Sequence, residues 1–186
     1  MKHVVLDLDN TLISAEALTE FPFEEEGIRD KALNFAIHDM DGYYIVFERP
    51  LLQEFLDHLF ENYTVSVWTA ATKDYALFII DKIILTKPSR SLKHIMFKYH
   101  CEISNQLYNT SKKLKLIWEF FKLPGYNQHN TIIIDDLRDV KKVQPHNAIQ
   151  IYPFEILEDG SEGDNVLESI VTEIEDAFTS LEDRRN

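Results

Sequence analysis

The sequence predicts an α/β fold, a Rossmann-like parallel sheet with helices on both faces and a small β-hairpin insertion. Residues 4–6 and 131–134 are short continuous apolar runs, largely of β-branched residues, and each runs directly into acidic residues. Such runs are typical of strands buried inside a parallel sheet. Apolar residues recur at helical spacing between these runs, and strands that alternate with helices indicate a sheet covered on both faces.

The remaining elements follow from local patterns. Alternating or continuous apolar residues predict strands at residues 4–6, 64–68, 95–103, 131–135 and 148–151. Apolar residues at helical spacing predict helices at residues 51–60, 75–85, 112–122 and 165–181. Two β-prone runs on either side of Asp41-Gly42 predict a hairpin over residues 34–48. The polar, acidic stretch of residues 15–31 is expected to be a loop.

Length and charge limit the possible classes of protein. At 186 residues the chain has the size of one domain, and we expect residues 1–186 to form a single domain without a separate cap domain. The net charge of −13 argues against an extensive nucleic-acid or anionic-membrane surface, because both require clustered positive charge. Residues 86–94, with three basic side chains, form the one locally basic loop.

The expected location is intracellular, in the nucleus or the cytoplasm. Cys101 is the only cysteine, so an internal disulfide is excluded and a reducing compartment is favoured. No apolar run reaches the length of a transmembrane helix, and the first residues do not resemble a signal peptide. We therefore expect no membrane partner.

Acidic residues gather where the predicted strands end. Asp7 and Asp9 follow the first strand, and Asp135 and Asp136 end the strand at residues 131–135. The carboxyl ends of parallel strands share one edge of the sheet, where such folds place their ligands. Carboxylates are the ligands that Mg²⁺ prefers, so we expect a divalent-cation site there.

Two further residues fit an anion at the same edge. Thr69 follows the predicted strand at residues 64–68, and Lys112 begins the predicted helix at residues 112–122. A hydroxyl and an ammonium group suit phosphate oxygens, and a cation with a lysine offsets the charge of a phosphoryl group in transfer. Lys113 and Lys115 remain alternatives for the lysine.

The motifs DLDNTLIS, WTAAT and IIIDD, with a lysine between the last two, resemble those of the haloacid-dehalogenase superfamily. More narrowly, with ERPLLQEFL, FKYHC and DDLRDVKKVQPHNAIQI, the chain resembles the NLI-interacting-factor-like phosphatases that act on the carboxy-terminal domain of RNA polymerase II. The resemblance covers residues 4–178. It implies a Mg²⁺-dependent phosphoserine or phosphothreonine protein phosphatase, with a phosphoprotein as its substrate.

The resemblance also implies roles for individual residues. Asp7 matches the nucleophile that forms an aspartyl-phosphate, and Asp9 matches the general acid and base. Thr69 and Lys112 match phosphate-binding positions. The implied Mg²⁺ ligands are the Asp7 carboxylate, the main-chain carbonyl of Asp9, and Asp135 or Asp136. Tyr75 and Lys98 match positions that contact a peptide substrate. Lys98 stands where the family often has arginine, and Tyr75 is equally compatible with helix packing.

Two other functions stay open on the same fold. One is a capless phosphatase for small molecules or nucleic-acid ends. The other is a non-catalytic binding protein, although the loss of the second aspartate that typifies such a protein is not seen, because Asp9 is present. The site, and not the fold, must decide among them.

Overall fold

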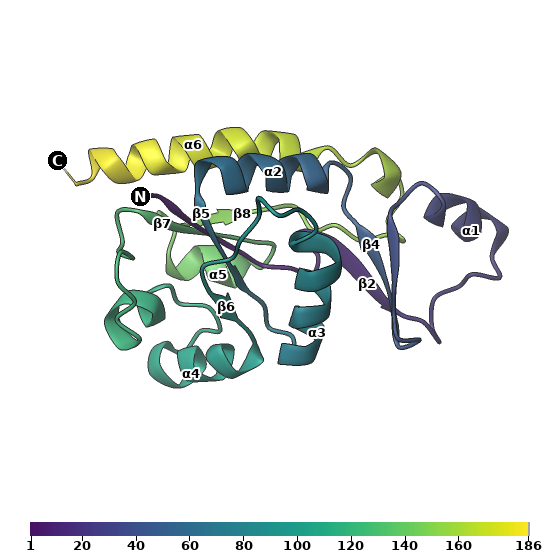
Figure 1. Cartoon of the computed structure of the whole chain (residues 1–186), viewed down its shortest axis with the longest axis horizontal. Coiled ribbons are helices and arrows are strands. Elements are labelled where there is room, and N and C mark those ends of the chain that lie inside the picture. Colours follow the sequence, from purple (N-terminus) through teal and green to yellow (C-terminus); the bar gives the residue numbers. More distant parts are fainter. Residues whose placement is uncertain (186) are drawn as a thin grey trace.

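The computed structural model describes residues 1–185 and contains a five-stranded parallel sheet (Figure 1). Its strands are β1 (His3–Leu6), β5 (Thr64–Trp68), β6 (Ile95–Met96), β7 (Thr131–Asp135) and β8 (Ala148–Gln150). Their spatial order is β6-β5-β1-β7-β8, so β1 lies at the centre and is hydrogen-bonded on both sides. The predicted parallel α/β sheet is confirmed.

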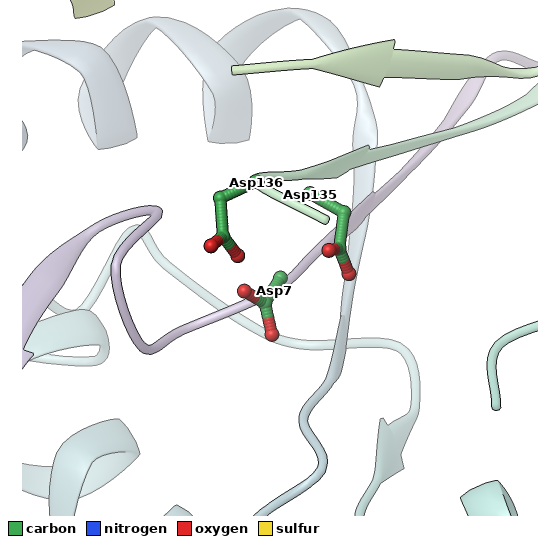
Figure 2. Close-up of side chains that lie close together, drawn as sticks. All are labelled: Asp7, Asp135 and Asp136. Atoms are coloured by element: carbon green, nitrogen blue, oxygen red, sulfur yellow. The ribbon is translucent and has the colours of Figure 1, made fainter. Parts of the chain in front are cut away.

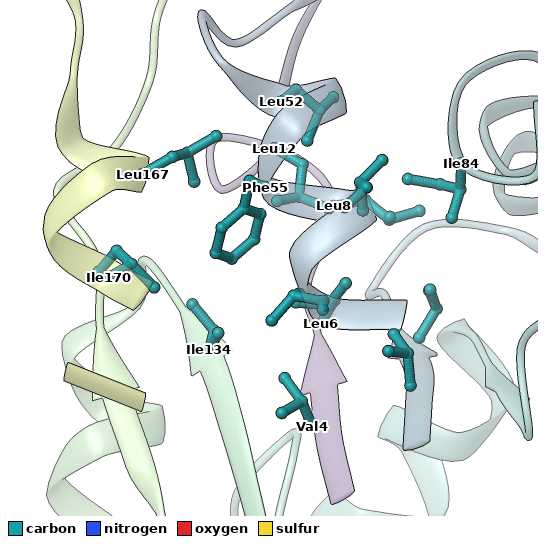
Figure 3. Close-up of a cluster of buried hydrophobic side chains, with 14 of the residues drawn as sticks. Val4, Leu6, Leu8, Leu12, Leu52, Phe55, Ile84, Ile134, Leu167 and Ile170 are labelled. Atoms are coloured by element: carbon teal, nitrogen blue, oxygen red, sulfur yellow. The ribbon is translucent and has the colours of Figure 1, made fainter. Parts of the chain in front are cut away.

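Successive residues of the central strands face two separate apolar cores. Val4 and Leu6 of β1 belong to one core, with α2 (Leu52–Asn62) and α6 (Val166–Asp183), as Figure 3 shows. Val5 belongs to the other core, with Trp68. Side chains alternate across a strand, so one continuous apolar run supplies both faces of the sheet.

Different helices cover the two faces. The first core is completed by α3 (Lys73–Ile79) and the π-helical turn that continues it, Ile80–Ile84. The second is covered by α4 (Lys98–Tyr108), α5 (Arg138–Val143) and a π-helical turn at Leu116–Phe120. None of the helices within residues 1–185 combines the length and the apolar character that a bilayer crossing would require.

A small antiparallel sheet is inserted between β1 and α2. It consists of β2 (Ile13–Ala17), β4 (Tyr44–Glu48) and β3 (Ile37–Met40), in that spatial order. The predicted hairpin is confirmed as β3 and β4. The loop predicted at residues 15–31 is wrong in part, because β2 extends to Ala17 and α1 (Glu26–Ala32) follows. The strand β2 is stabilised by pairing with β4, some thirty residues away.

Two other local predictions were wrong. The strand predicted at residues 95–103 is only β6, and the chain then turns into α4. The helix predicted at residues 112–122 is confined to the π-helical turn, so Lys112 lies in the loop after α4 and does not begin a helix. Near the end of the chain, a short 3₁₀ turn at Ser161–Gly163 precedes α6.

Candidate active site

The predicted carboxylates converge at the carboxyl edge of the parallel sheet. Asp7 directly follows β1, Asp135 is the last residue of the neighbouring strand β7, and Asp136 comes next. Figure 2 shows the three carboxylates turned toward one another. One oxygen from each lies within 4.8 Å of the others. The register of β1 on β7 therefore brings together residues that are more than 120 positions apart.

The ammonium group of Lys112 lies among these carboxylates. Its Nζ donates to Asp7 Oδ1 at 2.6 Å and to Asp135 Oδ2 at 2.7 Å. Only 1% of the residue is exposed. Burial alone would lower the pKa of Lys112, but the two carboxylates outweigh it and hold the pKa above its usual range, so the group is charged. Lys113 and Lys115 point elsewhere, to the Val143 carbonyl and to Glu119.

One lysine does not neutralise three carboxylates. Burial, followed by the charge of Asp7, raises the pKa of both Asp135 and Asp136 above the ordinary aspartate range. Such mutual repulsion is what a divalent cation relieves, and an all-oxygen donor set suits Mg²⁺. The residues present therefore fit a hard divalent cation. The side chain of Asp9 is not part of this group.

The carboxylate of Asp7 is oriented by a residue that sequence reasoning missed. Thr11 Oγ1 donates to Asp7 Oδ2 at 2.9 Å, while Lys112 occupies the other oxygen. Asp135 is fixed in a similar way, since the Leu137 main-chain N–H donates to its Oδ1 at 2.9 Å. Thr11 lies four residues after Asp7, and that spacing is the only sequence signal that could have indicated it.

The loop that carries Lys112 is held by two buried polar side chains. Gln144 donates to the Lys112 carbonyl at 2.8 Å and accepts from the Leu114 N–H at 3.0 Å. Ser104 donates to the Thr110 carbonyl at 2.6 Å and accepts from the Lys113 N–H at 2.9 Å. These bonds replace the helix that the sequence predicted, and no sequence pattern indicated either residue.

Asp9 occupies a different environment from Asp7. Its Oδ1 accepts a hydrogen bond from the Tyr75 hydroxyl, and the Tyr75 ring packs edge-on against Tyr44 with centroids 5.7 Å apart. Burial raises the pKa of Asp9, the Tyr75 hydrogen bond opposes that shift, and the charge of Asp7 adds to it. The net effect favours a protonated Asp9 at higher pH than an ordinary aspartate. Tyr75 thus contacts Asp9 as well as packing in its helix.

Thr69 and Lys98 lie at the same edge. Thr69 follows β5, is fully buried, and its Oγ1 accepts from the Ala71 N–H at 3.1 Å. Lys98 is the first residue of α4, and its N–H donates to the Ala71 carbonyl at 2.8 Å. Its side chain is exposed and forms no ion pair within residues 1–185. Both residues therefore sit beside the turn at residues 69–71.

The basic loop of residues 86–94 contributes less free positive charge than its composition suggests. The Arg90 side chain is buried and donates to Asp57, to Gln53 and to the Ile84 carbonyl. Lys87 pairs with the same Asp57 at 2.5 Å. Both cations thus fasten the loop to α2. Of the three basic residues in the loop, Lys93 alone has no ion-pair partner within residues 1–185.

A buried ion pair supports the loop behind the site. The Arg49 guanidinium donates to both oxygens of Asp164 at 2.9 Å and to the Thr11 carbonyl at 3.0 Å. On the other side of this loop, Asn10 and Phe154 exchange two hydrogen bonds. Asn10 has a left-handed backbone conformation, with φ of 61°. The segment of residues 154–164 thereby fixes the loop that contains Asp9.

Comparison with known proteins identifies relatives over nearly the whole chain. The family model described as NLI interacting factor-like phosphatase matches residues 2–185. A CTD phosphatase-like protein of Invertebrate iridescent virus 6 is 44% identical over 175 residues, which are 90% of this chain and 93% of that protein. Its counterpart in Invertebrate iridescent virus 3 is 39% identical over 172 residues, 89% of this chain and 91% of the relative.

The fold has a solved counterpart. The structure of Fcp1, the fission yeast RNA polymerase II CTD phosphatase, bound to beryllium fluoride, matches 97% of this chain with a TM-score of 0.59 at 23% identity. This chain spans half the length of that structure. The matching family model, the viral relatives and the shared architecture agree, and the chain belongs to the NLI interacting factor-like phosphatase family.

Proposed function

We propose that the protein is a Mg²⁺-dependent phosphoserine or phosphothreonine protein phosphatase in which Asp7 is the nucleophile. The observation that carries the proposal is the group of Asp7, Asp135 and Asp136 with the Lys112 ammonium among them, at the carboxyl edge of the sheet. A structural ion pair needs one carboxylate for each lysine. Three converging carboxylates repel one another and raise the free energy of the folded protein, unless a bound cation offsets their charge.

In the first half of the reaction, an oxygen of Asp7 forms a bond to phosphorus while the bond from phosphorus to the serine or threonine oxygen breaks. The leaving oxygen needs a proton, and Asp9 supplies it. Burial, which raises the pKa of Asp9, keeps this proton on the carboxyl at a pH where an exposed aspartate has lost it. Tyr75, which donates to Asp9 Oδ1, orients the carboxyl toward the edge of the site.

In the second half, a water molecule attacks the aspartyl-phosphate. Asp9, now ionised, takes a proton from this water, phosphate leaves, and Asp7 regains its carboxylate. Before the attack, Thr11 and Lys112 hold Asp7 in one orientation, because each bonds a different oxygen of its carboxylate. Lys112 and Thr69 are the residues proposed to stabilise the phosphoryl oxygens.

A divalent cation would be held by Asp7, by Asp135 or Asp136, and by the main-chain carbonyl of Asp9. When bound, it supplies positive charge that offsets the charge of the phosphoryl group in transfer. Among divalent cations, Mg²⁺ suits a set of carboxylate and carbonyl oxygens in which water completes the coordination.

The substrate proposed is an exposed segment of a phosphoprotein, and the carboxy-terminal domain of RNA polymerase II is the candidate that the names of the relatives suggest. A protein segment can itself cover an open edge and exclude water there. The net charge of −13 favours a phosphoprotein over nucleic-acid ends, which carry additional phosphates.

The metal requirement is tested with p-nitrophenyl phosphate. Chelation with EDTA should abolish turnover, and Mg²⁺ should restore it with saturation. An Asp136→Asn variant, which keeps the side-chain volume, should require more Mg²⁺ for half-maximal rate. Full turnover in chelator would contradict the cation assignment.

The substrate class is tested with a panel of compounds. It should contain phosphoserine and phosphothreonine peptides, among them a phosphorylated heptad repeat of the polymerase tail, together with sugar phosphates and a 5′-phosphorylated oligonucleotide. Protein phosphatase activity predicts the highest kcat/KM for a phosphopeptide. A preference for a sugar phosphate or for the oligonucleotide would favour the capless small-molecule or nucleic-acid phosphatase. No turnover of any compound would favour a binding protein.

A further inference from the structure

A pocket of about 560 Å³ opens beside the proposed general acid. It lies between α3 and the turn that joins β3 to β4, and Figure 1 shows α3 beside the strands β2 and β4 of the small sheet. Asp9 and Tyr75, which share a hydrogen bond, both line it. A segment bound over Asp9 therefore passes the mouth of this pocket.

Aromatic side chains form part of the pocket wall. Tyr43, Tyr44, Tyr75 and Phe78 all line it, and Tyr43 is 75% exposed at the tip of the hairpin. The rings of Tyr44 and Tyr75 are nearly perpendicular, at 87°, which fixes the wall nearest to Asp9. Aromatic faces bind aliphatic chains and, through the ring quadrupole, cations.

Besides Asp9, two further carboxylates line the pocket, one on each side. Asp41 belongs to the hairpin turn and Asp74 to the first turn of α3. Neither forms an ion pair within residues 1–185. The ammonium group of Lys82 pairs with Asp81 at 2.9 Å, and this pair is the main reason for the raised pKa of Lys82. Asp41 makes only a smaller contribution to that pKa. No lysine or arginine lines the pocket.

We propose that this pocket binds a lysine or arginine side chain of the phosphoprotein substrate, close in sequence to the phosphorylated residue. This inference rests on the proposed function and adds a substrate preference to it. The methylene stem of such a side chain matches the aromatic walls, and its charged end matches the two carboxylates. Because Asp9 itself lines the pocket, the basic residue lies within roughly three residues of the phosphorylated one, at about 3.3 Å per extended residue.

Charge on the whole molecule favours the same occupant. With a net charge of −13, the protein repels a segment whose only charges are phosphates, whereas a basic residue beside the phosphate reduces that repulsion. A purely apolar side chain would contact the rings but would leave Asp41 and Asp74 without a partner. A second phosphate in this pocket would face two carboxylates and no cation.

The experiment compares two phosphoserine peptides that differ at one position near the phosphoserine, where one has lysine and the other norleucine, which has no charge. The wild-type protein should hydrolyse the lysine peptide with a roughly three- to tenfold higher kcat/KM, the range expected for partly exposed charge contacts with a cation–π contribution. The variant Asp41→Asn/Asp74→Asn should reduce this ratio to about one. As a control, Asp176→Asn removes a charge from the exposed face of α6 and should keep the ratio of the wild type.

Direct binding separates this inference from the proposed function. Fluorescence anisotropy with unphosphorylated versions of the two peptides reports occupation of the pocket even if no phosphate ester is hydrolysed. Tighter binding of the lysine peptide, reduced in Asp41→Asn/Asp74→Asn, would support the pocket. Equal binding and equal kcat/KM for the two peptides, or a lysine preference that the double variant retains, would overturn it.

Discussion

At the scale of single residues, the site depends on an unequal balance of charge. Lys112 provides one buried positive charge to Asp7 and Asp135, while Asp136 adds a further carboxylate beside them. A buried ion pair adds little to stability compared with an apolar pair, but loss of one partner leaves an uncompensated charge. Loss of Lys112 would therefore leave the charges of Asp7 and Asp135 without a buried partner.

Replacement of this lysine should destabilise the protein strongly. We expect Lys112→Met to lower the free energy of unfolding in EDTA by about 3–5 kcal/mol, because Asp7 and Asp135 lose their buried partner. Urea denaturation measures the change, and Mg²⁺ should recover part of it, since the cation then supplies the missing charge. Lys115→Met is the matched control: Lys115 forms an exposed pair with Glu119, and its loss should cost less than about 1 kcal/mol. Equal effects of the two substitutions would contradict this account.

The two aspartates should respond differently to removal of their charge. Asp9→Asn should slow the hydrolysis of alkyl phosphates by about 10²–10⁴-fold, because their leaving oxygen needs a proton. It should slow activated aryl phosphates far less, and Asp7→Asn should abolish the turnover of both. Steady-state kcat with phosphoserine and with p-nitrophenyl phosphate makes the comparison. Near-normal turnover in Asp7→Asn would rule out the covalent mechanism.

At the scale of elements, two segments distant in the sequence hold the loop after β1. Arg49, just before α2, donates hydrogen bonds to both the Thr11 carbonyl and the Asp164 carboxylate. Asp164 also accepts from the Val166 N–H at the start of α6. The position of Asp9 thus depends on α2 and α6 as well as on β1.

A double-mutant cycle can measure this support. Arg49→Met should lower the free energy of unfolding by about 3–5 kcal/mol, since it leaves Asp164 without its partner, and it should reduce kcat as the loop loosens. Asp164→Asn keeps an acceptor for Val166 but leaves the fully buried Arg49 guanidinium without its counter-charge, so it should cost a similar amount. The coupling energy between the two changes should lie in the range of about 0.5–3 kcal/mol. Strict additivity would show that the pair does not act as a unit.

At the scale of the whole molecule, two surfaces of different charge lie beside the edge of the sheet. The aromatic pocket with Asp41 and Asp74 includes Ala71 in its lining, and the exposed Lys98 lies beside the same turn at residues 69–71. A segment bound at this turn would therefore be near both carboxylates and an ammonium group.

Replacement of Lys98 tests whether its exposed ammonium group contacts a bound phosphopeptide. Lys98→Ala should raise KM for a phosphopeptide and should lower its kcat/KM more than that of p-nitrophenyl phosphate, because it removes binding remote from the reacting atoms. Glu102→Ala, an exposed change one turn further along α4, serves as a control and should leave the ratio of the two constants unchanged. Equal losses on both substrates would place Lys98 beside the reacting phosphate instead.

The sequence predicted the elements whose patterns are local. The apolar runs that became β1 and β7 are buried on both faces, so each residue had to be apolar, and Asp7, Asp135 and Asp136 at their ends followed directly. The strand β2 was missed because its stability comes from pairing with β4. The helix α4 was missed because the alternating apolar residues Phe97, Tyr99 and Cys101 suggest a strand. In the folded chain this segment is a helix that packs Cys101 against the second core.

The parts of the site that could not be predicted are those that depend on distant contacts. Nothing in its neighbourhood distinguishes Lys112 from Lys113 or Lys115, and its burial results from the bonds that Gln144 and Ser104 make to the loop. In the same way, the composition of residues 86–94 suggested a basic surface, but the partner of Arg90 is Asp57 on α2. Such pairings become visible only when the chain is folded.

The support of the loop after β1 by residues 154–164 also has a consequence for biosynthesis. Asn10 leaves the ribosome long before Phe154 and Asp164 can reach it, and at about 5–20 residues per second the delay is roughly 8–30 s. During that interval Asp7 and Asp9 are synthesised, but the contacts that fix them do not exist. In a nascent chain, the loop after β1 should therefore stay unfixed until the segment of residues 154–164 has emerged from the ribosome.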